Sequence, residues 1–290
     1  MSKQLKYQVI LHFIVLIWGV TGILGNMISV SASKIVFFRT LIAFISLLII
    51  GFFFKQSTKL SSKKIGLLIL VGIIVGLHWF TFFYAIKIST ISIGVVCMSM
   101  STLFTSFLEP LFLKRKLSLS EIIISIFILF GIVLIFGFET KYILGIIFGL
   151  ISAFLAALFT VLNGKLIHNL SSFNITKYEM LGALTISLVF IIFTGEFDAE
   201  LFKLSINDVS FLIFLGVVCT SIAFLVSVWV MTQLTPFTVS LSVNMEPIYT
   251  IIIAILLFPN KEKMSVGFYI GGGIIITSIL INSFLKQRKS

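Results

Sequence analysis

Long apolar runs separated by short polar segments are the dominant pattern of this sequence. An α-helix needs roughly 20 apolar residues to cross the hydrocarbon core of a bilayer. Runs of this kind predict membrane spans at 7–28, 35–54, 65–88, 91–113, 121–138, 143–167, 175–194, 209–234, 236–258 and 266–285. The pattern therefore predicts an all-α integral membrane protein with ten transmembrane helices.

Composition agrees with this prediction and excludes a soluble globular domain. Hydrophobic residues make up 59% of the 290 residues and charged residues 11%, whereas a soluble domain has about 25% charged residues. The first apolar run, 9–28, is longer than the core of a typical signal peptide. We therefore expect it to be retained as the first helix.

The positive charges predict how the chain is oriented in the membrane. With the N-terminus inside, fourteen Lys and Arg residues fall in inside segments and seven in outside segments. Because positive residues favour the cytoplasmic side, both termini are predicted to be cytoplasmic, in a multi-pass protein of a bacterial-type inner membrane. The acidic loop 194–208 then faces outward. The net charge of +11 indicates contact with anionic lipid, and no nucleic-acid partner is expected.

Two weak internal matches suggest that the chain is a repeat. Residues 84–102 align with 229–247 at an offset of 145, and 37–41 align with 177–181 at an offset of 140. The first match pairs Tyr84 with Trp229, Thr90 with Thr235, Met100 with Met245 and Thr102 with Pro247. Repeats of five helices, 1–138 and 139–290, must be inverted relative to each other because five is odd, and inverted repeats are typical of secondary transporters with a central cavity. The alternative is that any two helices rich in Leu, Ile and Ser align weakly.

Glu246 and Pro247 interrupt the predicted span 236–258 near its middle. A charge at the bilayer centre costs about 2.5–3.5 kcal/mol on insertion scales. Proline leaves the carbonyl of Val243 without its helical partner, and lipid cannot satisfy that carbonyl. We therefore expect this helix to line a polar cavity, the alternative being a neutral, hydrogen-bonded glutamate at a packed kink.

Polar residues near Glu246 and its repeat counterpart Ser101 extend this prediction. Asn244 precedes Glu246, and Ser99 and Thr102 flank Ser101. Two equivalent helices thus become polar at the same depth, as expected of a cavity wall and not of lipid contact.

Aromatic residues and one histidine complete the predicted substrate and coupling cavity. His78 is predicted to lie mid-helix, where it can bind a carboxylate or relay a proton, although a hydrogen-bonded packing role is an alternative. Trp79 and Tyr84 are candidates for an aromatic wall. Trp18 and Trp229 are further candidates on the first and eighth predicted helices.

Three more charged residues fall within predicted spans. Arg39 and Glu179 are repeat equivalents, so inversion predicts them near opposite membrane faces as gate or vestibule charges. Snorkelling to the interface is the alternative for both. Glu109 is predicted to pair with the basic cluster 114–116.

The sequence contains no motif typical of an enzyme or of a metal or cofactor site. It has no HExxH and no Walker or dinucleotide glycine loop, and its three histidines are far apart. Cys97 and Cys219 lie in apolar runs and are expected to be buried thiols. We therefore expect no enzyme, cofactor or metal, the alternatives to a transporter being a channel or, less favoured, a membrane-embedded enzyme.

The chain resembles the EamA type of the drug/metabolite transporter superfamily, in its ten-helix branch. The resemblance is carried by Trp18-Gly19, Arg39, FFYAIKISTISIG (82–94), MEPIYTIIIAILLF (245–258) and GFYIGGGIIITSILI (267–281). Departures are the missing proline at Thr102, Lys114-Arg115 in place of a Gly-Glu pair, and Pro259-Asn260-Lys261 before Glu262.

The resemblance implies two inverted five-helix repeats, a central cavity and alternating access. It also implies export or exchange of small metabolites, commonly amino acids or related compounds. Together with the residues above, it predicts a secondary active transporter with a small-molecule substrate, the lipid bilayer and protons as partners. Glu246 and His78 are the predicted binding or coupling residues, and no oligomeric state is predicted.

Overall fold

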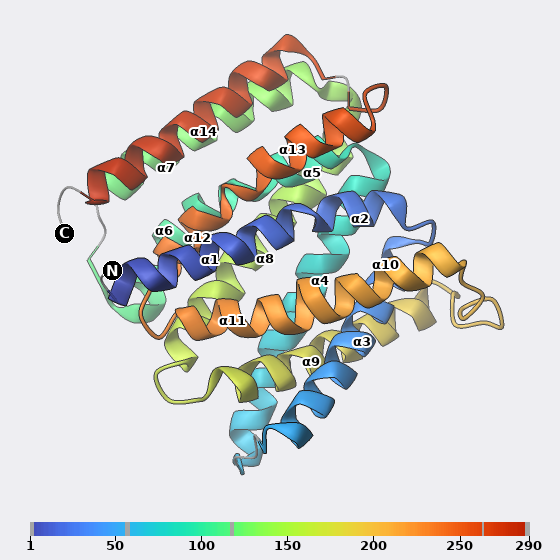
Figure 1. Ribbon diagram of the computed structural model, residues 1–290. Helices are drawn as coiled ribbons and strands as arrows, with labels where there is room; N and C mark the ends of the chain where they lie inside the picture. Colours follow the sequence, from blue (N-terminus) through green and yellow to red (C-terminus); the bar gives the residue numbers. More distant parts are fainter. Residues whose placement is uncertain (1–2, 56–58, 117–118, 263, 288–290) are drawn as a thin grey trace.

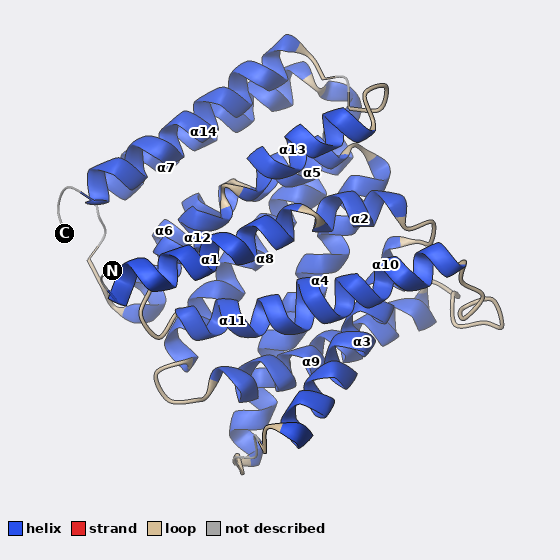
Figure 2. Ribbon diagram, viewed as in Figure 1, coloured by secondary structure: helices blue, strands red, loops and turns tan. Residues whose placement is uncertain are grey.

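The computed structural model describes residues 3–55, 59–116, 119–262 and 264–287, and this part of the chain is helical without strands (Figures 1 and 2). The elements are α1 (Lys3–Gly19), α2 (Thr21–Met27), α3 (Ala32–Phe53), α4 (Ser62–Ile88), α5 (Ile91–Met98), α6 (Met100–Leu113), α7 (Leu119–Phe138), η1 (Thr140–Tyr142), α8 (Ile143–Leu166), α9 (Ser172–Phe193), α10 (Ile206–Gly216), the π-helical η2 (Val217–Ile222), α11 (Ala223–Val230), α12 (Pro236–Val243), α13 (Glu246–Leu257) and α14 (Val266–Gln287).

Eight helical segments of the described residues are long and apolar enough to cross a membrane. They are Gln4–Met27, Ala32–Phe53, Ser62–Ile88, Ile91–Leu113, Thr140–Leu166, Ser172–Phe193, Ile206–Val230 and Pro236–Leu257. Helices α7 and α14 coincide with the two remaining predicted spans. The chain is thus a multi-pass helical membrane protein, as the apolar runs predict.

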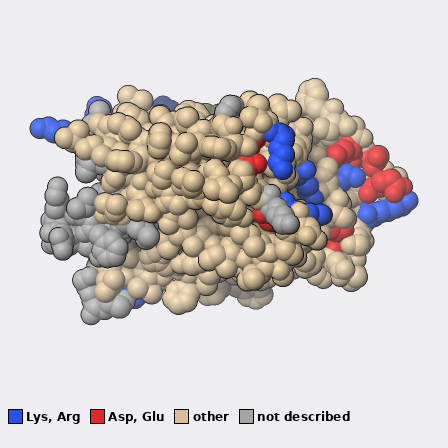
Figure 3. All heavy atoms as spheres, turned by 90° about the horizontal axis from the view of Figure 1, so that it is seen from above, with Lys and Arg blue, Asp and Glu red and all other residues tan. Residues whose placement is uncertain are grey.

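The charged side chains on the surface are distributed as expected of a membrane protein. The face in Figure 3 has acidic and basic side chains gathered at one end, basic side chains at the other, and an uncharged band between them. Large apolar side chains such as Phe52, Phe193 and Leu256 are exposed, at 81%, 85% and 75%. Such a surface suits lipid, because hydrocarbon accepts apolar side chains and rejects charge.

Two of the membrane segments are broken at equivalent positions. The segment Ile91–Leu113 is interrupted at Ser99, between α5 and α6, and Pro236–Leu257 is interrupted at Asn244, between α12 and α13. Ser99 and Asn244 differ by the repeat offset of 145. Irregular backbone at membrane depth is tolerated only where it is buried in protein or lines a cavity. The breaks therefore mark the interior of the bundle.

Each broken segment has a carboxylate at or just after its C-terminal end, and this carboxylate caps the N-terminus of the other broken segment. Glu262 follows α13, and its two carboxyl oxygens accept from the backbone N–H groups of Ile91 and Ser92, each at 3.0 Å. Glu109, near the end of α6, accepts from the N–H of Phe237 at 2.7 Å. Helix N-termini have unpaired N–H groups and a positive dipole end, so both contacts are favourable. The two broken segments consequently run antiparallel, side by side.

Close helix contacts fix the frame around these segments. A Cβ added to Gly72 of α4 would overlap the carbonyl of Glu179 on α9, and one added to Gly182 of α9 would overlap the carbonyl of Ile69. Small residues allow such backbone approach in membranes. Helices α7 and α14 form a separate pair at one edge (Figure 1), where Gly131 and Gly271 approach each other in the same way. Gly271 thus allows α7 and α14 to pack closely, whereas a Cβ added to Gly272 or Gly273 would meet nothing within 4 Å.

Candidate functional site

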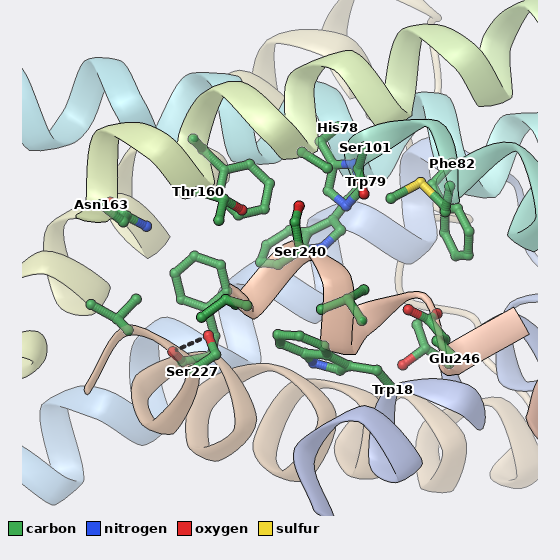
Figure 4. A pocket seen from close by; sticks show the side chains of 18 of the residues that line it. Trp18, His78, Trp79, Phe82, Ser101, Thr160, Asn163, Ser227, Ser240 and Glu246 are labelled. Atoms are coloured by element: carbon green, nitrogen blue, oxygen red, sulfur yellow. Dashed lines mark hydrogen bonds between the residues drawn. The ribbon is translucent and has the colours of Figure 1, made fainter. Parts of the chain in front are cut away.

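The candidate site is a cavity in the interior of the bundle (Figure 4). Its polar and charged lining consists of Thr21, Arg39, His78, Ser101, Thr160, Asn163, Ser227, Ser240 and Glu246. Its free volume is about 90 Å³, well above the roughly 10–15 Å³ that a single water molecule needs. The structure therefore places His78, Ser101 and Glu246 on one cavity, as the cavity prediction requires.

Glu246 lies at the start of α13, next to the break in the second broken segment. Its side chain lines the cavity beside Trp18 (Figure 4), and its carboxyl oxygens have no hydrogen-bond partner among the described residues. Thr250 donates to the backbone carbonyls of Glu246 and Gly19, at 2.9 and 2.7 Å, which ties α13 to α1. These hydrogen bonds fix the backbone at Glu246, while its carboxyl group faces the cavity.

Arg39 brings a buried cation to the same cavity from α3. Its guanidinium lies 4.1 Å from the ring centroid of Trp79, and its Nε donates to Thr220 Oγ1 at 2.6 Å. Thr220 belongs to the π-helical turn η2 and in turn donates to the carbonyl of Leu215. Turns of this kind occur frequently at functional sites. Nη1 of Arg39 has no partner among the described residues, so the cation is only partly satisfied by protein groups.

Arg39 and Glu246 carry opposite charges but do not form a direct ion pair. Both side chains line the cavity, and within the described chain no N···O distance between them is 4.0 Å or shorter. A buried cation and a buried carboxylate that do not pair with each other are costly in a low-dielectric interior. The cavity therefore presents one anion-binding and one cation-binding group to whatever enters it.

His78 is held in a defined orientation on α4. Its Nδ1 lies 3.0 Å from the carbonyl oxygen and 2.8 Å from the hydroxyl of Ser152 on α8. A carbonyl can only accept, so we assign the proton of the neutral ring to Nδ1 and its lone pair to Nε2. His78 is thus hydrogen-bonded within the helix packing, as the alternative predicts, and its ring also lines the cavity.

Five aromatic rings contribute to the remaining, apolar part of the wall. They are Trp18, Trp79, Phe82, Phe159 and Phe224. Trp18 is fixed by a 3.0 Å hydrogen bond from its Nε1 to the carbonyl of Cys219, and Phe224 packs against Trp79 and Phe159 at centroid distances of 6.0 and 5.8 Å. The wall is therefore apolar and rigid around the two charges.

Five of the predicted cavity residues lie off the lining. Thr102 and Asn244 are buried and joined to each other by a hydrogen bond between the two broken segments, and Ser99 is buried at the first break. Tyr84 is 36% exposed and packs on Phe80 and Phe148, and Trp229 stacks on Tyr7. The rings predicted for the wall at Tyr84 and Trp229 therefore do not reach the cavity.

The two predicted gate charges are both buried. Arg39 is 2% exposed and lines the cavity, and Glu179 is 0% exposed and accepts from Asn163 Nδ2 at 3.1 Å. Snorkelling is wrong for both side chains, because their charged ends stay within the protein. Glu109 pairs with Arg115 at 3.0 Å, so its predicted pairing with the basic cluster is confirmed.

Several lining residues were not among the predicted cavity set. Thr160 and Asn163 follow Ser152 and Ala156 along one face of α8, at spacings of three and four residues. That spacing places them on one side of a helix and was the available signal. Ser240 stands one turn before Asn244, and its hydroxyl lies 3.0 Å from that of Thr105. In the described parts of the chain, no three His, Cys, Asp or Glu residues are grouped so that they could hold a metal ion.

Comparison with known proteins adds to this geometry. The sequence model of the EamA-like transporter family matches the chain twice, over residues 6–137 and 143–284. The chain belongs to the EamA-like transporter family. Family membership places it in the drug/metabolite transporter superfamily, as the resemblance predicts.

Two relatives agree with this assignment. An uncharacterized transporter of Clostridium kluyveri is 23% identical over 237 residues, covering 78% of this EamA-like chain and 75% of the relative. A solved crystal structure, described only as that of a protein, superposes with a TM-score of 0.73 at 13% identity, over 97% of this chain and 98% of the other. The first indicates a membrane transporter, and the second shows that the fold is shared along nearly the whole length.

Proposed function

We propose that this EamA-like protein is a secondary active transporter that exports or exchanges small zwitterionic metabolites, such as amino acids, by alternating access. The observation that carries the proposal is the placement of Arg39 and Glu246 on one cavity without a direct ion pair. A solute with a carboxylate and an ammonium group satisfies both charges at once, because each solute charge meets the opposite charge of the protein.

The rest of the cavity supports a small substrate with an apolar part. Its wall contains five aromatic rings, and its free volume of about 90 Å³ suits a small solute. Aromatic faces bind apolar groups and also attract cations. We therefore propose that Arg39 binds the carboxylate, Glu246 the ammonium group, and Trp18, Trp79 and Phe82 the side chain.

Two inverted five-helix repeats, 1–138 and 139–290, forming ten transmembrane helices, are part of the proposal. Support comes from the double family match, the two breaks at Ser99 and Asn244, and the reciprocal capping by Glu109 and Glu262. Broken helices at a repeat interface are typical of transporters that rock around a fixed site. The termini are proposed to be cytoplasmic, in an inner membrane.

Contacts at the two ends of the bundle then act as gates. At the outward end, Ser29 donates to Asp208 through its backbone N–H and its hydroxyl, each at 2.7 Å, and Ser31 and Ser33 donate to Glu196. These contacts join the two halves of the chain, so they must open for release to that side. At the cytoplasmic end Glu109 joins α6 to α12 in the same manner.

Protons are the proposed coupling ion, with Glu246 and His78 as the exchanging groups that face the cavity. A carboxyl group that binds either a proton or the substrate ammonium group couples the two movements, because both cannot occupy it together. His78 offers Nε2 as a second acceptor, since Nδ1 is held by Ser152.

Transport assays test this function in two steps. Comparison of metabolite efflux between cells with and without the protein identifies the substrate. In proteoliposomes, Glu246→Gln should slow proton-coupled flux more than exchange, while Glu200→Gln, in the exposed outer loop, should match the parent. Equal flux of the Glu246 variant and the parent at every pH removes the coupling role, and flux without saturation or counter-transport indicates a channel instead.

A further inference from the structure

Glu179 is a second intramembrane carboxyl group, separate from the cavity lining. It lies on α9, is 0% exposed, and has one side-chain hydrogen bond in the described structure, from Asn163 Nδ2 to its Oε2. Its other oxygen, Oε1, and the Oδ1 of Asn163 are both buried without a hydrogen-bond partner among the described residues. Two unpaired acceptors in one side-chain pair require an explanation, because buried polar atoms are nearly always satisfied.

One proton resolves this imbalance. A carboxylate and an amide oxygen can only accept, so neither can pair with the other. A protonated carboxyl group gains an O–H donor, and Asn163 Oδ1 becomes an acceptor for it. An acid and a primary amide can then pair through two hydrogen bonds. The donor count of the pair therefore favours the protonated form of Glu179.

Among the described residues, no cation pairs with Glu179 to stabilise an ionised carboxylate. On the helices packed against α9, Arg39 of α3 is engaged with Trp79 and Thr220, and His78 of α4 is held by Ser152. Lys165 of α8 and the lysines of α4 are exposed, α11 has no titratable residue, and Lys177 of α9 itself lies over the rings of Phe173 and Tyr178. A buried carboxylate without a paired cation is strongly disfavoured.

Asn163 connects this group to the cavity. The same side chain that bonds Glu179 lines the cavity, at the end opposite Glu246 in Figure 4. Asn163 thus stands between the cavity and Glu179, and reorientation of its amide would open a path from the cavity to the carboxyl group. On α4, the backbone contact of Gly72 with Glu179 makes the position sensitive to movement between α4 and α9.

We propose that Glu179 is a further proton-carrying site of this transporter, besides Glu246 and His78, loaded and unloaded from the cavity through Asn163 as α4 and α9 move. This rests on the proposed function as a proton-coupled transporter. The carboxylate takes a proton from cavity water and later returns it to water, and no other group is changed. Buried carboxyl groups of this kind mark proton relays in membrane proteins.

Infrared difference spectroscopy of the purified protein in liposomes, recorded between acidic and alkaline buffer, tests the site without any substrate. We expect a band of a protonated carboxyl group that disappears at high pH, is absent from Glu179→Gln and is shifted in Asn163→Ala. Glu246→Gln and Glu200→Gln should retain it. A band that survives in Glu179→Gln, or a Glu179 band that never changes with pH, overturns the proposal.

Proton movement during transport provides the second readout. A pH dye trapped in proteoliposomes reports protons that accompany the substrate identified by efflux. Glu179→Gln should lower the number of protons per substrate while exchange continues, and Glu200→Gln should leave the ratio unchanged. An unchanged ratio in Glu179→Gln overturns the proposal. If the parent transports nothing, the proposed function fails, and the infrared result still decides whether Glu179 exchanges a proton.

Discussion

The guanidinium of Arg39 lies 4.1 Å from the ring centroid of Trp79, inside the bundle and on the wall of the central cavity. This stacking orients the cation, and a 2.6 Å hydrogen bond to Thr220 fixes its Nε. Stacked and partly desolvated cations gain up to about 2 kcal/mol from the ring. Arg39 is thereby held in place for a solute anion although no carboxylate of the described chain pairs with it directly.

Substitution of Arg39 by Lys keeps the charge and removes the planar stack. We expect the KM for the exported metabolite to rise about tenfold or more, since a hydrogen bond to a charged group contributes about 1.5–3 kcal/mol. Initial rates in proteoliposomes measure this. Lys203→Gln removes an exposed cation of the outer loop and should leave KM unchanged. A folded Arg39→Lys protein with the parental KM would show that the guanidinium does not contact the substrate.

Trp79 and Tyr84 provide a comparison within one helix. Trp79→Ala removes a ring that lines the cavity and stacks on Arg39, whereas Tyr84→Ala removes a partly exposed ring on the outside. We expect Trp79→Ala to lower kcat/KM about tenfold or more, because a desolvated cation–π contact contributes about 2 kcal/mol. Tyr84→Ala should retain at least most of the parental activity. Equal losses for the two variants would contradict the assigned wall.

Gly72 tests the contact between α4 and α9. Gly72→Ala would place a methyl group against the carbonyl of Glu179, while the same change at Gly66, earlier on α4, meets nothing within 4 Å. Overpacking costs about 1–3 kcal/mol, so we expect Gly72→Ala to lower the melting temperature in detergent. Gly66→Ala should melt at or above the parental temperature. Identical melting of both variants would mean that the two helices pack less closely than described.

Glu262 tests the capping of the first broken segment. Its carboxylate accepts from two backbone N–H groups at the start of α5, and charge-assisted bonds of this kind contribute about 1.5–3 kcal/mol each. Glu262→Ala should therefore destabilise the protein clearly in thermal unfolding. Glu200→Ala, in the exposed loop, is the matched control. Equal melting temperatures of the two variants would show that the Glu262 cap does not stabilise the protein.

The membrane fold and the position of Glu246 in the site could be predicted from the sequence. Apolar runs of spanning length can be read without tertiary information, and a carboxylate beside a proline in such a run is conspicuous because hydrocarbon accepts neither. Glu246 was found for that reason, and it lines the cavity. The break at Ser99 had no such mark, since Thr102 stands where a proline is expected, and the repeat offset predicted polar residues there but no break.

Residues whose role depends on helix rotation were not predictable in the same way. Tyr84 follows Trp79 by five residues, and at about 100° per residue this turns it far from the cavity face of α4. Trp229 packs on Tyr7, more than 200 positions away in the sequence, and no local pattern indicates that contact. From the sequence, the Arg39 side chain could extend to a membrane interface or into the bundle interior. Its contacts with Trp79 and Thr220 hold it in the interior.

The central claim is that water reaches the broken segments in the middle of the membrane, and cysteine accessibility measures this directly. In a background with Cys97 and Cys219 replaced by Ala, Ser101→Cys and Ser240→Cys place one thiol on each broken segment, and Ile252→Cys places one on the exposed, lipid-facing side of α13. A charged thiol reagent needs water and thiolate to react. We predict labelling of Ser101→Cys and Ser240→Cys in intact membranes and none of Ile252→Cys. If neither cavity thiol reacts from either side of the membrane, the account is contradicted.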